Sequence, residues 1–415
     1  MRKRYLKLFG VLAIATSILS LPAQAQEKKL DRPVKFGIVS ALSGDAAAFG
    51  KPFVDAIKVA IDELNARGGL LGQPIEMIAY DDRGVPDLGL QVAKKLVLED
   101  HVDTLQPGST SGVIFTAMPV GKDQKVAMWG YGLAEQWLVE GEGMIFRSAS
   151  SDKVRLTALA KYAHDQLALK KVGVLYIDNF YGQSARDVFK AAYKSAGNDV
   201  ATEVSHNEGA RDISSQLLQL RTKGLDGIFV ATTGAGFGPL VRQVRQFLPK
   251  NVVVMTDAQS ADPKIRAELG ASANGIVYAG TPMVPQNTDP LSQEWIARLK
   301  EKTGLYQEIM SRAVTGVLVM ADAIKRAGTV DPIEVMKAVH HTRGLATPVG
   351  TYTYDPRDGE GLKTALVMKA ADSPEKDEIL TTVRIDEPLY EKRLNYDRFF
   401  GPDYTKSLYE FHNVQ

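Results

Sequence analysis

The sequence predicts an α/β protein made of two doubly wound, Rossmann-like lobes, each built on a parallel sheet. Three observations lead to this fold class. The chain has 415 residues, more than one hydrophobic core normally serves. Apolar strand signals alternate with amphipathic helix signals, as expected for parallel strands covered by helices on both faces. The alternation pauses in the irregular segment FRSASS (146–151) and starts again at Asp152, so two successive units are expected.

The first unit begins with the apolar strand segment VKFGIVS (34–40). The helix that follows has Val54, Ile57, Ile61 and Leu64 at spacings of three and four, which places them on one face. The same signals then predict, in order, a strand over 75–80, a helix over 88–97, a strand over 102–107, a helix over 111–120 and a strand over 125–130.

The second unit repeats this rhythm and is followed by a long return segment. Its elements are expected as helix 156–167, strand 170–178, helix 185–195, strand 198–205, helix 214–223, strand 227–233, helix 240–247, strand 251–257 and strand 275–280. The return segment contains helix signals over 292–302, 313–327 and 332–339, and strand-like stretches at 351–355 and 364–370. Its length favours several crossings between the lobes over a single linker.

The N-terminus has the three parts of a secretory signal peptide. Arg2, Lys3, Arg4 and Lys7 precede an uncharged stretch, which ends in a site with small residues at Ala23 and Ala25; the uncharged stretch is Leu8–Leu21. Fourteen helical residues span about 21 Å, less than the roughly 30 Å of a hydrocarbon core. We therefore expect residues 1–25 to be a signal peptide cleaved after Ala25 and the protein to be periplasmic, with an uncleaved tether as the alternative.

Composition narrows the classes of function. The formal net charge is +1 with scattered Lys and Arg, which gives no electrostatic footprint for nucleic acid. There is no cysteine, so an exported chain of this kind holds together without disulfides and without a lipid anchor at a cleavage-site cysteine.

Three motifs that resemble catalytic or cofactor sites do not complete their patterns. The segment Gly108–Gly112 has the spacing of a nucleophile elbow, but its central residue is Thr110. The segment Gly234–Gly238 follows a strand as a dinucleotide fingerprint should, but Pro239 stands where its third glycine belongs. The six histidines show no metal-ligand spacing. We therefore expect no enzyme activity, no cofactor and no metal.

Binding is better supported than catalysis. Ser109, Thr110 and Ser111 lie where a strand passes into a helix, and such helix starts bind carboxylate or phosphate. Simple N-capping is an equally good explanation of these hydroxyls. Aromatic residues also gather at strand ends, where the ligands of parallel sheets collect, although they could simply cover the sheet; they are Phe49, Trp129, Tyr131, Phe180, Tyr181 and Phe237.

Several segments together resemble the periplasmic branched-chain amino acid (Leu/Ile/Val)-binding family of ABC transporters. They are VKFGIVSALSGDAAAFG, AIDELNARGGLLGQPIEMIAYDDRGVPDLGLQVAKKLV, QPGSTSG, IDNFYGQS, VRQVRQF and VMTDAQ, and the similarity extends to about residue 370. The resemblance implies a type 1 periplasmic binding protein fold with three crossovers, near 146–151, 278–282 and 350–354. The first lobe would comprise 34–149 and 281–351, and the second 150–280 and 352–384. Residues 385–415 would form a C-terminal extension outside the pattern.

The family's ligand-binding positions transfer to this sequence residue by residue. The resemblance implies that Ser109 receives the ligand carboxylate, that Tyr131 contacts it from the next loop, and that Tyr181 closes over the ligand from the second lobe. The full set of expected ligand-binding residues is Phe49, Ser109, Thr110, Ser111, Trp129, Gly130, Tyr131, Gly132, Tyr181, Thr233, Gly234, Asp257 and Gln259.

Two departures from the family bear on the ligand. Amino acid-binding relatives have an acidic residue for the α-ammonium group where this sequence has Ala258, although Asp257 could serve if the register shifts by one. An unpaired, desolvated ammonium would cost several kcal/mol. Trp129 and Tyr131 are bulky where relatives often have small residues. The sequence therefore favours an aromatic or other non-amino-acid carboxylate.

The expected function is capture of this carboxylate by hinge closure and its delivery to a membrane permease of an ABC importer. A branched-chain or other amino acid is the alternative ligand. A periplasmic sensing module that feeds a receptor or sensor kinase is the alternative function. We expect a monomer whose partners are the small molecule and the permease.

Overall fold

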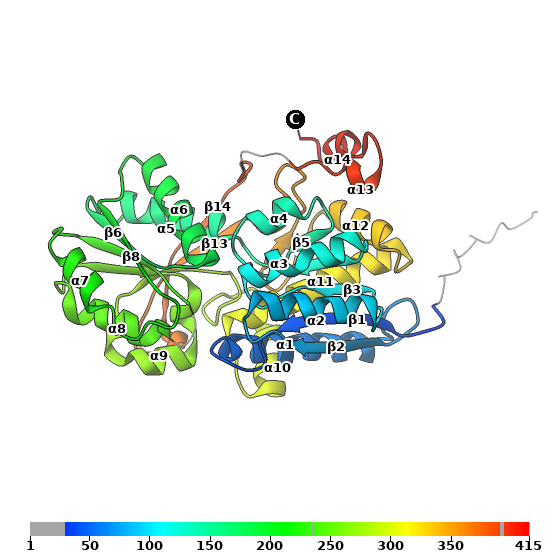
Figure 1. The fold of residues 1–415 in the computed structure, drawn as a ribbon, viewed down its shortest axis with the longest axis horizontal. Helices are drawn as coiled ribbons and strands as arrows, with labels where there is room; N and C mark the ends of the chain where they lie inside the picture. Colours follow the sequence, from blue (N-terminus) through cyan, green and yellow to red (C-terminus); the bar gives the residue numbers. More distant parts are fainter. Residues whose placement is uncertain (1–29, 234–235, 391–393, 415) are drawn as a thin grey trace, which may run out of the picture.

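The computed structural model describes residues 30–233, 236–390 and 394–414, which form two α/β lobes side by side (Figure 1). The predicted signal peptide, residues 1–25, lies outside the described residues. Within the described part of the chain, no helix has the length and apolar character needed to cross a bilayer.

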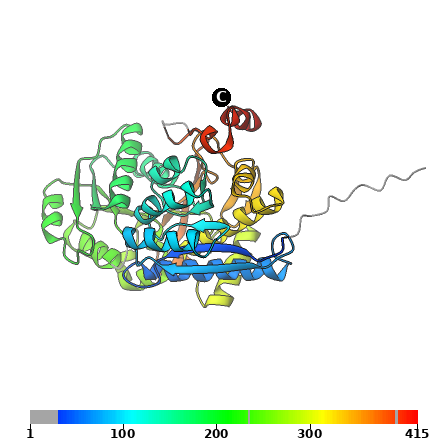
Figure 2. The same cartoon turned by 45° about the vertical axis from the view of Figure 1, so that its right-hand side comes forward.

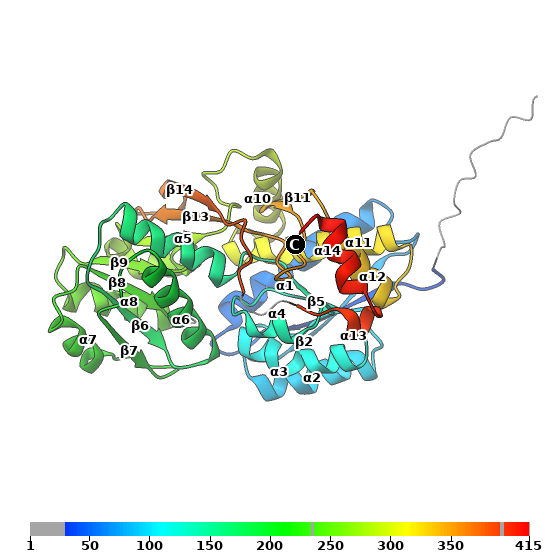
Figure 3. The same cartoon turned by 90° about the horizontal axis from the view of Figure 1, so that it is seen from above.

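The first lobe is built on a five-stranded, fully parallel sheet with the strand order β2-β1-β3-β4-β5. Its strands are β1 (Val34–Ser40), β2 (Ile75–Asp81), β3 (Thr104–Gln106), β4 (Ala127–Gly130) and β5 (Ile145–Arg147). Its helices are α1 (Ala47–Ala66), α2 (Pro86–Leu98), α3 (Ser111–Asp123), α4 (Gln136–Glu140), α10 (Pro290–Thr303), α11 (Glu308–Ala327) and α12 (Pro332–His340). Helix α1 packs on α11, and α2 packs on α3 (Figures 1 and 3).

The second lobe has a seven-stranded sheet in the order β14-β13-β10-β9-β8-β6-β7. Its strands are β6 (Val172–Ile177), β7 (Thr202–His206), β8 (Gly227–Ala231), β9 (Val253–Thr256), β10 (Val277–Gly280), β13 (Thr364–Lys369) and β14 (Glu378–Arg384). Its helical segments are α5 (Asp152–Asp165), α6 (Phe180–Ser195), α7 (Ser214–Arg221), α8 (Phe237–Phe247), α9 (Pro263–Leu269), η2 (Ala258–Ala261), η3 (Gly270–Ala273) and η4 (Pro374–Lys376).

This second sheet differs from the purely parallel one that the sequence predicts. Strands β6 to β10 are parallel, whereas β13 runs antiparallel to β10 and β14 antiparallel to β13. The strand-like stretch 351–355 lies outside both main sheets. Part of it forms β12 (Gly350–Tyr352), which pairs with β11 (Leu345–Thr347) in a separate hairpin. Short alternating patterns cannot distinguish a hairpin strand from a sheet strand.

The two lobes place the helix that follows their first strand in the same way, α1 after β1 and α6 after β6. In each lobe a glycine in the first turn of a helix lies against the carbonyl of the preceding strand or its turn. A Cβ atom on Gly50 would lie 2.0 Å from the carbonyl oxygen of Ala41, and one on Gly182 would lie 2.0 Å from that of Ile177. These glycines let the helix starts come close to the strand ends, which is where the cleft lies.

The chain crosses between the lobes more often than the family pattern implies. It passes from the first sheet to the second after β5, returns after β10, and enters the second sheet again before β13. After β14 it runs back to the first lobe, where α13 (Asp397–Phe400) contacts α12 and leads into α14 (Tyr404–His412) (Figures 1 and 2). The exact residue boundaries of the lobes stay a prediction.

Candidate functional site

A cleft of about 620 Å³ lies between the lobes, at the carboxyl ends of both sheets. From the first lobe it is lined by the turns that follow β1, β2, β3 and β4. From the second lobe it is lined by the turns that follow β6, β7, β8 and β9. Gln307, Glu308, Ile309 and Arg312, at the beginning of α11, also line it. A volume of this size suits a small organic molecule.

Most of the predicted site residues line this cleft. They are Phe49, Ser109, Thr110, Ser111, Tyr131, Gly132, Tyr181, Thr233, Asp257 and Gln259. Gly234 lies outside the described residues. Trp129 and Gly130 are not part of the lining.

Trp129 is a correction to the expectation drawn from the sequence. Its indole is fully buried between β4 and α11, where a Cβ atom on Gly316 would lie 2.1 Å from the ring. It also packs against Phe53, with ring centroids 5.8 Å apart. Side chains alternate between the two faces of a strand, and the indole of Trp129 lies on the face of β4 that packs against α11. Its bulk therefore supports the lobe and does not shape the cleft.

The turn at Ser109 is held by a buried carboxylate that sequence reasoning missed. Asp82, fully buried just after β2, accepts hydrogen bonds from the Ser109 backbone N–H at 2.9 Å, the Ser109 hydroxyl at 2.7 Å and the Gly84 N–H at 2.7 Å. Burial raises the pKa of Asp82, while these hydrogen bonds oppose the shift. Both Ser109 donors are therefore engaged by the protein itself.

The hydroxyls of Thr110 and Ser111 both accept hydrogen bonds from the protein, so only backbone groups of this turn stay available to a ligand. The Thr110 hydroxyl caps α3 by accepting from Val113 N–H at 3.2 Å. The Ser111 hydroxyl accepts from the backbone N–H groups of Leu133 and Ala134 at 3.1 and 3.3 Å. The backbone N–H groups of the first helical residues have no intrahelical acceptor, and at α3 those of Ser111 and Gly112 lie beside the cleft. The backbone of α3, more than the Ser109 side chain, can therefore receive an anion.

Tyr131 lines the cleft, but its hydroxyl is hydrogen-bonded within the protein. The hydroxyl donates to the carbonyl oxygen of Ser109 at 2.6 Å, and the ring packs on Phe53 with centroids 4.0 Å apart. Burial raises the pKa of Tyr131, so the hydroxyl stays protonated as a donor. The expected contact between this hydroxyl and the ligand is replaced by a contact that shapes the Ser109 turn.

The opposite wall carries a connected polar group in the second lobe. Tyr181 donates its hydroxyl to Asp257 at 2.6 Å. Asp257 also accepts from the backbone and side-chain N–H groups of Gln259 at 3.0 and 3.3 Å, and Gln259 donates to the carbonyl oxygen of Thr232 at 2.9 Å. Burial first, and then the charge of Asp257, raises the pKa of Tyr181 well above its ordinary value.

Several residues that line the cleft have buried polar side-chain atoms without a partner among the described residues. They are the Thr232 hydroxyl, Gln259 Oε1, His206 Nε2 and Gln307 Oε1. His206 is the last residue of β7, so its place at a strand end is a sequence signal that points to the cleft. The start of α11, in the return segment, brings Gln307, Glu308 and Arg312 to the cleft. Arg312 and Glu308 form an ion pair with an N–O distance of 2.6 Å. No sequence signal points from this helix start to the cleft.

Charge and metal chemistry are limited at this site. The lining has more carboxylates than guanidinium groups. The guanidinium groups are those of Arg83 and Arg312, and the carboxylates are those of Asp45, Glu208, Asp257, Asp262 and Glu308. In the part of the chain that the structure describes, no group of three or more His, Cys, Asp or Glu residues is arranged to hold a metal ion.

Two α/β lobes that enclose a small-molecule cleft between the carboxyl ends of their sheets define a bilobal binding protein. The family model described as "periplasmic binding protein" matches residues 33–375, and the chain belongs to this family. By this membership it is a binding protein rather than an enzyme.

A named relative supports this class, and solved structures share the fold. Leu/Ile/Val-binding protein homolog 3 of Brucella melitensis is 27% identical over 354 residues, which cover 84% of this chain and 93% of that protein. The leucine-binding protein LivK of Thermotoga maritima aligns with a TM-score of 0.77 and 21% identity, covering 85% of this chain and 99% of that one. A solute-binding protein of R. palustris, solved in complex with 4-hydroxybenzoate, aligns with a TM-score of 0.77 and 18% identity, covering 86% and 98%.

Proposed function

We propose that the protein is the extracytoplasmic solute-binding component of an ABC importer and captures a small organic carboxylate, with an aromatic or related non-amino-acid acid as the favoured ligand. One observation carries this proposal. The cleft sets open backbone N–H groups at the start of α3 beside partly exposed aromatic rings, a combination that suits an anionic head on an apolar body.

The carboxylate would bind the N-terminus of α3, where the backbone N–H groups of Ser111 and Gly112 meet the positive end of the helix dipole. The ring or apolar body would pack against Phe49, Leu133 and Phe180. A polar substituent at its far end would meet the unpaired groups of Thr232 and Gln259 on the second lobe.

A ligand that contacts both lobes would favour their closure around it. A ligand favours closure by its extra affinity for the closed state, and here the far wall gains hydrogen-bond partners when the lobes close on a polar substituent. Closure would proceed about the predicted crossovers, and the closed form would deliver the ligand to a membrane permease. Export through the predicted signal peptide would place the protein in the periplasm.

An amino acid is the second candidate ligand, and the position of Asp257 favours it. The carboxylate of Asp257 faces the same cleft, opposite α3, where it could receive an α-ammonium group. Its two oxygens already accept three hydrogen bonds, from Tyr181 and from Gln259, which reduces what it can offer a cation. The 4-hydroxybenzoate complex of the R. palustris relative supports the aromatic ligand, and the names of the Leu/Ile/Val-binding relatives support the amino acid.

Calorimetric titration and thermal unfolding with a matched panel test this proposal. The panel is benzoate, 4-hydroxybenzoate, phenylalanine, leucine, valine and the neutral control benzamide. A bound acid at 100 times its Kd should stabilise the protein by about 2.7 kcal/mol, and benzamide should not. Micromolar binding of leucine or valine without any response to the benzoates would overturn the aromatic assignment. The Asp257→Asn variant should weaken the binding of an amino acid and leave the binding of benzoate unchanged.

A further inference from the structure

The loop that follows β4 is held from outside by two side chains. The Ser111 hydroxyl accepts from the backbone N–H groups of Leu133 and Ala134. From the other side, the Arg147 guanidinium donates to the carbonyl oxygens of Gly132 and Ala134, the latter at 2.8 Å. Because Gly132 and Leu133 line the cleft, these four hydrogen bonds set the shape of the wall that faces the ligand.

Arg147 is itself fixed from behind. It is the last residue of β5, is fully buried, and lies over the ring of Trp137 at 4.3 Å. Its Nε donates to Glu360 Oε1 at 2.9 Å in an ion pair with neither side chain exposed. A buried guanidinium depends on such a partner for its orientation as well as for its charge.

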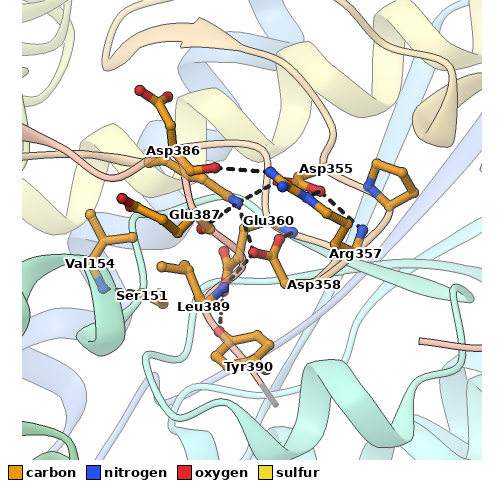
Figure 4. Close-up of polar contacts among 12 residues, drawn as sticks. Ser151, Val154, Asp355, Arg357, Asp358, Glu360, Asp386, Glu387, Leu389 and Tyr390 are labelled. Atoms are coloured by element: carbon orange, nitrogen blue, oxygen red, sulfur yellow. Dashed lines mark hydrogen bonds and ion pairs between the residues drawn. The ribbon is translucent and has the colours of Figure 1, made fainter. Parts of the chain in front are cut away.

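Glu360 connects this pair to the C-terminal segment. It lies between β12 and β13, and the oxygen that accepts from Arg147 also accepts the hydroxyl of Tyr390. Figure 4 shows Glu360 and Tyr390 together in a cluster of polar side chains. Tyr390 comes after β14 and beyond residues 33–375, which the family model matches.

The backbone around Tyr390 is also anchored. Leu389 N–H donates to the buried carboxylate of Asp358 at 2.9 Å, and the Lys363 ammonium donates to the Glu387 carbonyl oxygen at 3.3 Å (Figure 4). The hydroxyl of Tyr390 therefore reaches Glu360 from a fixed position, and the chain from Tyr390 through Glu360 and Arg147 to Gly132 is continuous and buried.

We propose that Tyr390 and Glu360 are positioning residues of the ligand site. They orient the Arg147 guanidinium, which holds the loop 131–134 in the shape that the ligand meets. The return of the C-terminal segment to the first lobe then serves ligand affinity as well as the packing of that lobe. The inference rests on the proposed function, because it assumes that this loop is part of the ligand wall.

The Tyr390→Phe variant tests the proposal, because it removes one hydroxyl and keeps the ring. In the ligand-free protein, hydrogen exchange of the Leu133 and Ala134 amides should accelerate while the remaining amides of the first lobe keep their protection. With benzoate as the probe, the Kd should rise about five- to tenfold. The Glu360→Gln variant should show the same pattern more strongly.

Tyr404→Phe is the matched control, since Tyr404 belongs to the same C-terminal extension and its hydroxyl lies 3.2 Å from His340 Nδ1. It should change neither the two amides nor the Kd. Unchanged exchange at Leu133 and Ala134 in Tyr390→Phe, or acceleration spread evenly over the lobe, would overturn the positioning role. If the unmodified protein binds no benzoate, the proposed ligand fails, and the exchange measurement still decides the role of Tyr390.

Discussion

The two walls of the cleft differ in how their polar groups are satisfied. On the first lobe, Ser109 is bonded to Asp82 and the Ser111 hydroxyl to two backbone N–H groups, so the side chains of this serine turn are paired without a ligand. On the second lobe, the Thr232 hydroxyl, Gln259 Oε1 and His206 Nε2 are buried and have no partner among the described residues. The serine turn of the first wall is paired within the protein, whereas these three polar side-chain atoms of the second wall are not.

Under the proposed function, this difference would give the lobes separate tasks. A preformed wall loses little conformational entropy when a ligand binds, so the first lobe is suited to initial capture. Buried polar atoms without partners are costly, and a ligand or ordered water that pairs with them lowers the free energy of the closed form. Mutations in the first wall should therefore change stability and binding together, whereas mutations in the second wall should change binding with little effect on stability.

The largest effect is expected for Asp82→Ala in the first wall. It leaves three half-buried donors without an acceptor, at no more than about 1–3 kcal/mol each, partly offset by the loss of a desolvated carboxylate. The net loss in the free energy of unfolding should be about 2–4 kcal/mol in chemical denaturation, and the thermal shift by ligand should disappear. Asp82→Asn, which keeps an acceptor, is the control; equal stability of the alanine variant and the unmodified protein would refute a self-supported wall.

Ser111→Ala should have the next largest effect. It removes the acceptor of the Leu133 and Ala134 N–H groups, which should cost about 1–3 kcal/mol of stability and about tenfold in ligand affinity. Thr116→Ala on the same helix, whose hydroxyl donates to the Gly112 carbonyl oxygen, should have a much smaller effect on affinity. Calorimetric titration of both variants checks the ranking, and equal losses of affinity would contradict it.

The sequence was sufficient to predict where the cleft lies, because strand ends and helix starts are local features. Ser109, Thr110 and Ser111 are recognisable from a strand that turns into a helix, and the order of elements in each lobe follows from periodicity. The partners of these residues were not predictable. Asp82 lies 27 residues before Ser109, and its pairing with the serine depends on β2 and β3 lying on either side of β1 in the folded sheet.

The same limit explains the two clearest misses. Trp129 follows a strand pattern that marks it as buried, but only the packing of α11 against β4 decides which face of the sheet it occupies. Tyr390 lies in a segment without family resemblance, and its contact with Glu360 joins residues 30 positions apart across β13 and β14. Long-range pairings of this kind leave no periodic signal in a single sequence.

Acidification should change the stability contributed by one group on each wall in opposite directions. Burial lowers the pKa of His206 on the second wall, so the unfolded chain binds its proton first. The stability that comes from a neutral His206 is therefore full above about pH 6.5 and is lost as pH falls through the lower folded-state pKa, by at most about 1.4 kcal/mol per pH unit. Urea unfolding at pH 7.5 and 5.5 should show a smaller decrease for His206→Gln than for the unmodified protein.

Asp82 on the first wall should act in the opposite direction. Burial raises its pKa, so the folded state binds the proton more readily and this group alone favours folding as pH falls towards the unfolded-state value. The Asp82→Asn variant should therefore lose more stability on acidification than the unmodified protein. If both variants lost more stability on acidification than the unmodified protein, or both lost less, the contrast between the walls would be refuted.

The smallest effect on stability is expected for Thr232→Val, which replaces an unpaired buried hydroxyl by a methyl group of similar shape. Because the hydroxyl has no partner among the described residues, the free energy of unfolding should change by less than about 0.5 kcal/mol or increase slightly. The affinity for a ligand with a polar substituent, such as 4-hydroxybenzoate, should fall about fivefold, whereas that for benzoate should not. Calorimetric titration with both acids measures the difference. A loss of stability above about 1 kcal/mol would mean that an ordered water already pairs with this hydroxyl, and the second wall would then be as complete as the first.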